Sequence, residues 1–156
     1  MKRIAVVPDT QVKPGVKIDH LLYAGKYIAD KKPDVVVQIG DWWDMESLCS
    51  YDKGKTSFEG RRYKRDIEAG NLAMDLFLQP IKQEMNRLKV NKQKQWKPRF
   101  VFTMGNHEQR IERAIEFDSI LEDTIGYFDL NLSDWEVYDY LKPVVIEGVA
   151  FAHFFT

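Results

Sequence analysis

Two short apolar runs separated by one helical segment constrain the fold of this chain most strongly. Residues 4–7 and 35–39 are rich in β-branched side chains, which is typical of buried strands. Apolar residues recur at helical spacing from 18 to 29, and Pro33 ends that segment. A strand, a helix and a strand in this order indicate a βαβ unit, whose strands are parallel and joined by a right-handed crossover. We therefore expect an α/β fold with a mostly parallel first sheet and flanking helices.

The rest of the chain continues to alternate between helical and strand patterns. Helices are expected at 63–88, 107–116 and 118–125. Strands are expected at 99–103, around 135–138, and in a hairpin at 144–153. Pro80 should kink or break the long helix, because proline lacks a backbone N–H and clashes with the preceding turn. No internal repeat or linker interrupts the pattern, so we expect one domain over residues 1–156.

Composition is that of an ordinary soluble globular protein. The net charge is −1, with 44% hydrophobic and 30% charged residues, so the chain as a whole has no electrostatic case for binding nucleic acid or a membrane. Cys49 is the only cysteine, which excludes an internal disulfide. No stretch approaches the ~20 apolar residues of a membrane helix, and the N-terminal apolar run is too short for a signal sequence. We expect a cytoplasmic protein.

Polar side chains gather where the predicted strands end. In open α/β sheets, ligands bind outside the carboxyl ends of the strands. Carboxylate oxygen, amide oxygen and imidazole nitrogen are ligands of Mn²⁺, Fe and Zn²⁺, and two such ions can clamp a phosphate. The absence of cysteine from this set argues against a structural thiolate zinc site. The strand-end residues are Asp9, Gln11, Asp41, Asp44, Asn106, His107 and His153.

The order and spacing of these residues resemble those of the calcineurin-like metallophosphoesterases. Asp-x-Gln at 9–11, Gly-Asp-x-x-Asp at 40–44, Gly-Asn-His-Glu at 105–108 and the isolated His153 follow the order of that family's DxH, GDxxD, GNH(E/D) and H motifs. The Gln in the first motif and the Gly-Asn-His-Glu-Gln-Arg run look most like bacteriophage members. The resemblance covers residues 2–153 and implies the N-terminal part of the αββα sandwich of that family.

The resemblance also implies a pair of divalent metal ions. Asp9 would bind the first ion, Asp41 would bridge both, and Asn106 and His153 would hold the second. Gln11 stands where the family has a metal-binding histidine, and an amide oxygen is a poorer ligand for transition metals. We therefore expect a weakened first site, with Mn²⁺ as the first choice and Fe, Zn²⁺ or Mg²⁺ as alternatives. A mere loop role for Gln11 remains equally open.

The implied reaction is phosphoester hydrolysis, in which metal-bound hydroxide attacks phosphorus. His107 would be the general acid that protonates the leaving oxygen, and Asp44 would orient its ring. To these we add Arg110 and Arg113, one turn into the following helix, as contacts of a phosphate oxygen. The alternatives are a helix-capping role for Asp44 and a place in the core for His153.

One motif of the family has no counterpart in this chain. No Gly-His-x-His sequence follows His153, so we expect the domain to be C-terminally incomplete relative to the family. The leading hypothesis is a metal-dependent phosphodiesterase or nuclease. The alternative is a truncated, non-catalytic remnant, or half of a split enzyme that a second polypeptide or self-association completes by covering the incomplete sheet.

The substrate and the surface that binds it are less constrained. Nucleic acid, a cyclic nucleotide, a phosphoprotein and a small phosphate ester all remain open, and the phage-like motifs favour nucleic acid. Trp42 and Trp43 could stack on a base, but packing beneath a loop is the commoner role. The basic runs at 61–65 and 89–97 could follow a nucleic-acid backbone, but a solvated surface is again commoner.

Overall fold

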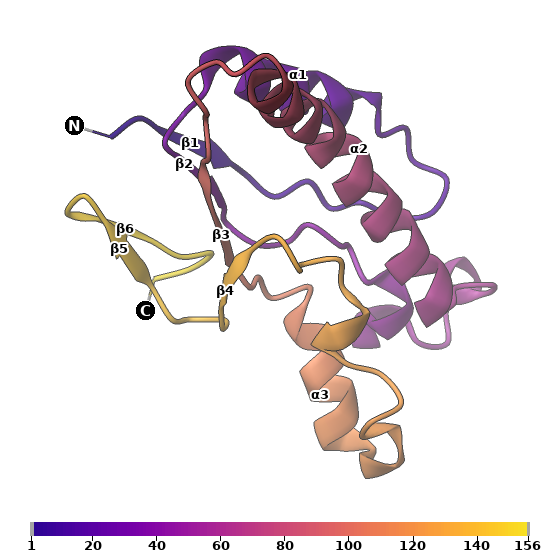
Figure 1. Ribbon diagram of the computed structural model, residues 1–156. Helices are drawn as coiled ribbons and strands as arrows, with labels where there is room; N and C mark the ends of the chain where they lie inside the picture. Colours follow the sequence, from indigo (N-terminus) through magenta and orange to yellow (C-terminus); the bar gives the residue numbers. More distant parts are fainter. Residues whose placement is uncertain (1, 156) are drawn as a thin grey trace.

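A four-stranded parallel sheet forms the centre of the computed structural model, which describes residues 2–155 (Figure 1). The strands are adjacent in sequence order and each neighbouring pair is parallel. The chain is thus mixed α/β, and the expected parallel sheet is confirmed. The segment around 135–138 is its fourth strand. The strands are β1 (Ile4–Val7), β2 (Val35–Gln38), β3 (Arg99–Thr103) and β4 (Glu136–Tyr138).

Two helices cover one face of the sheet. They are α1 (Asp19–Lys31) and α2 (Tyr63–Val90), which lie side by side in Figure 1. Phe77 of α2 packs in the same core as Val36 and Phe102 of the sheet. Pro80 was expected to kink or break the long helix, and the break does not occur, since α2 runs through Pro80. Pro80 is buried against Gly25 of α1, and this packing holds the helix together where one backbone hydrogen bond is lost.

The segment after β3 is less helical than its sequence pattern indicates. Helix α3 (Gln109–Phe117) forms, but the helix expected at 118–125 is only the single 3₁₀ turn η4 (Ser119–Leu121). Asp118 explains the difference, because its backbone is extended and its side chain accepts a hydrogen bond from the N–H of Ile120 at 3.2 Å. The remaining 3₁₀ turns are η1 (Glu46–Leu48), η2 (Ser50–Asp52), η3 (Thr56–Phe58) and η5 (Tyr127–Asp129).

The expected hairpin is confirmed and lies on the face of the sheet opposite the helices (Figure 1). It consists of β5 (Val144–Ile146) and β6 (Val149–Phe151). Val144 and Ile146 pack on the valines of the central sheet. Val145, which alternates with them, points outward and is 66% exposed, and Val149 beside the hairpin turn is 53% exposed. The fold therefore has three layers, namely the helices α1 and α2, the parallel sheet, and the β5–β6 hairpin.

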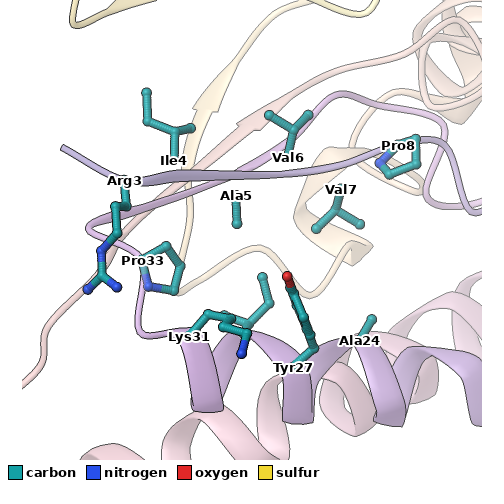
Figure 2. A pocket seen from close by; sticks show the side chains of 11 residues that line it. Arg3, Ile4, Ala5, Val6, Val7, Pro8, Ala24, Tyr27, Lys31 and Pro33 are labelled. Carbon is teal, nitrogen blue, oxygen red and sulfur yellow. The ribbon is translucent and has the colours of Figure 1, made fainter. Parts of the chain in front are cut away.

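Strand β1 lies at the edge of the sheet and pairs only with β2. Figure 2 shows that Ala5 and Val7 point toward α1, whereas Ile4 and Val6 point to the other side. A groove of about 510 Å³ lies between this strand and α1. None of the helices in residues 2–155 combines the length and apolar character needed to cross a membrane.

Candidate metal centre and catalytic site

The loops that follow β2 and β3 come into direct contact at the carboxyl end of the sheet. A Cβ atom on Gly40, whose φ is +92°, would lie 2.6 Å from the backbone nitrogen of Gly105. A Cβ atom on Gly105 would overlap the carboxylate of Asp41. Only glycine allows the two loops to approach this closely. The loops carry the two motifs that were singled out in the sequence, and these motifs meet as the parallel topology predicts.

The buried carboxylate of Glu108 connects these two loops. One oxygen accepts hydrogen bonds from the backbone N–H groups of Asp41 and Gly105, both at 2.9 Å. The other accepts from the N–H of Trp43 at 3.0 Å. Burial raises the pKa of Glu108, and the three N–H groups oppose this shift. Sequence reasoning gave Glu108 no role, although an acidic residue directly after His107 at the start of a helix was the available signal.

Asp41 occupies the centre of the site in a strained conformation. Its φ is +55°, in the left-handed region, and it is 3% exposed. One carboxylate oxygen accepts a hydrogen bond from the backbone N–H of His107 at 2.9 Å. Its backbone carbonyl accepts from the N–H of Gln11 at 2.9 Å, which holds the first-motif loop next to the site. Asp9 and Gln11 themselves are exposed, and neither side chain hydrogen-bonds to a residue in 2–155.

Three hydrogen-bond acceptors converge beside Asp41. The Nδ1–H of His153 donates to the carbonyl of Ile39 at 2.8 Å, which leaves a lone pair on Nε2 of the neutral ring. That Nε2 atom lies 2.9 Å from Oδ1 of Asn106 and 3.5 Å from Oδ2 of Asp41. Three acceptors cannot satisfy one another, so this point favours a bound cation such as a metal ion.

The donor set at this point fits a divalent metal. Imidazole, amide oxygen and carboxylate are all present, and a metal-binding histidine normally donates its other N–H to a carbonyl or carboxylate, as His153 does. Within residues 2–155, no group of three or more His, Cys, Asp or Glu side chains is placed to hold a metal ion. The three converging acceptors include only two side chains of these types, Asp41 and His153, and the third acceptor is the amide oxygen of Asn106. The predicted two-ion centre stays a prediction.

The predicted dyad of His107 and Asp44 is assembled next to this point. Nδ1 of His107 lies 3.0 Å from the carboxylate of Asp44 and 2.9 Å from its backbone carbonyl, so Nδ1 carries a proton. Burial lowers the pKa of His107, but the contacts with Asp44 and the charge of Asp41 outweigh it and raise the pKa overall. Burial raises the pKa of Asp44, but His107 and Lys13, 3.3 Å away, lower it overall.

The two arginines expected at a phosphate differ in their placement. Arg110 points into the protein, where Nη1 donates to the carbonyl of Asp44 at 2.7 Å and Nη2 lies 3.2 Å from Nε2 of His107. It therefore supports the dyad directly. Arg113 is exposed on α3 and has no ion pair with a residue in 2–155. A phosphate contact by either arginine stays a prediction.

Trp42 and Trp43 belong to the core. Both are 0% exposed, and Nε1 of Trp42 donates to the carbonyl of Gly70 at 3.0 Å. The ring of Trp43 packs against Gly70, where a Cβ atom would overlap it. The packing interpretation is confirmed, and stacking on a base is not available to these residues.

Comparison with known proteins finds two phage relatives. The chain is 38% identical over 137 residues to the Gene 54 protein of Mycobacterium phage L5, which covers 86% of this chain and 48% of that protein. It is 37% identical over 81 residues to the Gene 54 protein of Mycobacterium phage D29, covering 52% of this chain and 30% of that protein. The chain thus matches about half or less of the length of these curated relatives. No family model and no solved structure matches.

The relatives bear on the origin of the chain and leave its chemistry open. Both come from bacteriophages, which agrees with the phage-like character of the Gly-Asn-His-Glu-Gln-Arg run. Their names state no activity, ligand or partner.

Proposed function

We propose that this chain is a metal-dependent phosphoester hydrolase of the phosphodiesterase or nuclease kind, similar to the calcineurin-like metallophosphoesterases. The observation that carries the proposal is the convergence of Nε2 of His153, Oδ1 of Asn106 and Oδ2 of Asp41. These acceptors lie at the carboxyl end of a parallel sheet, where such folds bind ligands. The dyad of His107 and Asp44 lies next to them.

The converging acceptors would hold one divalent ion, with Mn²⁺ as the first candidate. Asp41 would share its carboxylate with a second ion on the side of Asp9 and Gln11, whose loop is bonded to its carbonyl. When bound, such ions supply positive charge that attracts a phosphate and offsets the negative charge of the transition state. An amide at Gln11 would make this position, the first site of the family's order, the weaker of the two.

His107, oriented by Asp44, would act as the general acid that protonates the leaving group. Asp44 holds Nδ1–H of His107 and fixes the ring, so the proton to be delivered is the one on Nε2. The raised pKa of His107 favours the doubly protonated ring that a general acid requires. Arg110 fixes the carbonyl of Asp44 through Nη1. Its Nη2 lies 3.2 Å from Nε2 of His107 and can donate only to the unprotonated nitrogen, so this contact would hold the ring once the proton has been delivered.

The test is turnover of bis(p-nitrophenyl) phosphate by the purified chain with Mn²⁺. The His107→Ala variant should lose roughly 10²-fold or more in turnover while its Mn²⁺ affinity, measured by calorimetry, changes little. The matched control is His20→Ala, since His20 is exposed on α1 and far along the chain from either motif. Equal turnover in the His107→Ala and His20→Ala variants would overturn the proposal.

The alternative is a non-catalytic remnant or one half of a split enzyme. It is favoured by the exposed valines Val145 and Val149 and by the unpaired edge of β1, which further protein would cover in a larger fold. Calorimetric titration with Mn²⁺ separates the candidates. Mn²⁺ binding with turnover supports the enzyme, and Mn²⁺ binding without turnover supports the split enzyme. Absence of both binding and turnover supports the remnant.

A further inference from the structure

A basic pocket lies at the end of the sheet opposite the candidate catalytic site. Its volume is about 600 Å³, and it opens where β1, β2 and β3 begin. Five cationic side chains line it, against the single acid Asp34. We call this surface the basic pocket. Its cations are Lys2, Arg3, Lys32, Lys94 and Lys97.

The cations come from three separate segments of the chain. Lys2 and Arg3 precede β1, Lys32 is the residue that ends α1, and Lys94 and Lys97 lie in the loop between α2 and β3. Figure 2 shows the side chain of Arg3 extending away from the start of β1, beside Pro33. The pocket is therefore produced by the fold and extends beyond the single basic run at 89–97.

Helix dipoles explain only part of this charge. Helices α1 and α2 both end in this region, and a cation near the last turn of a helix is stabilising. Of the five cations of the basic pocket, this accounts only for Lys32, which directly follows the last turn of α1. It does not account for Lys94 and Lys97, which follow the end of α2, or for the basic residues before β1.

Much of the charge in the basic pocket is not neutralised within the protein. Asp34 accepts a hydrogen bond from the backbone N–H of Arg3 at 2.7 Å, while the guanidinium of Arg3 donates to the carbonyl of Lys32 at 2.9 Å. Lys2 pairs with Glu147 at 3.3 Å, and an exposed pair of this kind is weak. Lys32 pairs with Glu84 at 2.9 Å, and this contact neutralises much of its charge. Lys94 and Lys97 are exposed and form no ion pair with residues 2–155.

An aromatic side chain lies among these cations. Trp96 lines the pocket and is partly buried, and its Nε1 donates to the carbonyl of Pro33 at 2.7 Å. This bond fixes the indole, and Trp96 lies between Lys94 and Lys97 in the sequence. A fixed aromatic ring within a group of cations is the arrangement by which proteins bind single-stranded nucleic acid without reading its sequence.

We propose that the basic pocket binds single-stranded nucleic acid through its phosphate backbone. Lys94, Lys97 and Arg3 contact phosphates, and the exposed part of Trp96 stacks on a base. The pocket needs neither the metal centre nor His107, so this inference goes beyond the proposed function. If the chain also hydrolyses nucleic acid, the pocket anchors the strand at a distance from the scissile bond.

The test is fluorescence anisotropy with a labelled oligothymidylate in the presence of EDTA, so that hydrolysis plays no part. Binding should weaken as salt is raised from about 50 mM to about 200 mM. The double variant Lys94→Glu, Lys97→Glu should bind roughly 10-fold or more weakly, and its salt slope should be smaller by about 1.4, since each lost phosphate contact on a single strand removes ~0.7.

The matched control is the double variant Lys26→Glu, Lys64→Glu, which changes the net charge equally at exposed helical positions outside the pocket. It should bind within about 2-fold of the parent chain, because neither lysine lines the basic pocket. Equal losses in the two double variants, absence of binding at low salt, or tighter binding to phosphatidylserine vesicles than to the oligonucleotide would each overturn the proposal.

Two further measurements keep this proposal separate from the proposed function. All four lysines are exposed, so circular dichroism and thermal unfolding should show that both double variants fold. Turnover of bis(p-nitrophenyl) phosphate should be the same in the Lys94→Glu, Lys97→Glu variant as in the parent chain. The His107→Ala variant should retain oligonucleotide binding. Loss of hydrolysis alone thus counts against the catalytic site, and loss of binding alone counts against the basic pocket.

Discussion

The carboxylate of Glu108 accepts a hydrogen bond at 2.9 Å from the backbone N–H of Asp41, 67 residues away in the chain. The same carboxylate also binds the N–H groups of Trp43 and Gly105. It therefore fixes the backbone of both motif loops and holds Asp41 in its left-handed conformation. The positions of the metal-type ligands depend on this buried group, which touches none of the proposed ligand atoms on Asn106 or His153.

We expect Glu108→Gln to destabilise the chain by about 3 kcal/mol, because an amide offers one oxygen where three N–H groups converge and leaves buried donors unpaired. The measurement is urea-induced unfolding followed by circular dichroism. The control is Glu116→Gln, at an exposed position of α3, which should change the free energy of unfolding by less than about 0.5 kcal/mol. Similar unfolding midpoints for the two variants would contradict a structural role for Glu108.

Gly105→Ala should separate the two motif loops. The added methyl group would overlap the carboxylate of Asp41, and relieving that overlap should cost about 2 kcal/mol and move Asp41 away from His153. The control is Gly54→Ala, where the added methyl group meets open space and only the positive φ of +85° is unfavourable, at about 1 kcal/mol. Thermal unfolding and Mn²⁺ binding check the result. A variant at Gly105 that keeps full affinity for Mn²⁺ would show that the close approach is unimportant.

The features that sequence could predict are those set by local patterns and parallel topology. The β-branched runs at 4–7 and 35–39 need burial on both faces, which specifies a parallel sheet with helical connections. Once the strands are parallel, their carboxyl ends share an edge, so Asp41, Asn106 and His107 must meet there. The hairpin turn at Glu147 and Gly148 could also be predicted from a local pattern, a glycine in a tight turn. Both residues adopt the positive φ that such a turn requires.

The features that sequence missed depend on contacts between distant elements. The continuity of α2 through Pro80 depends on packing against Gly25 of α1. The inward orientation of Arg110 depends on the carbonyl of Asp44 in another loop. The hydrogen bonds accepted by Glu108 require three backbone N–H groups that come together only when both loops have folded. None of these has a periodicity or a spacing along the chain that would reveal it.

Mn²⁺ affinity should fall by at least ~10-fold in His153→Ala and in Asn106→Ala, because each removes one of the three acceptors that converge at the site. Calorimetric titration of the purified variants measures this directly. His20→Ala removes a histidine from the exposed face of α1 and should leave the affinity unchanged. If the His153→Ala and His20→Ala variants bind Mn²⁺ equally well, the converging acceptors do not form the metal site.

The ion cluster at Glu84 should make stability depend on pH in the acidic range. Its carboxylate accepts two hydrogen bonds from Arg87, at 2.7 and 2.9 Å, and lies 2.9 Å from Nζ of Lys32 at the end of α1. These contacts lower the pKa of Glu84 from its ordinary 4.5 to about 2. A carboxyl group whose pKa is lower in the folded state adds stability above its unfolded pKa, and this stability is lost as pH falls through the folded pKa.

Glu84→Gln should therefore be less stable than the parent chain at neutral pH, and the difference should shrink between pH 4.5 and about 2. Urea unfolding at several pH values, with Glu116→Gln as the control, checks this. A difference that stays constant over that range would show that Glu84 acts through packing rather than through its charge.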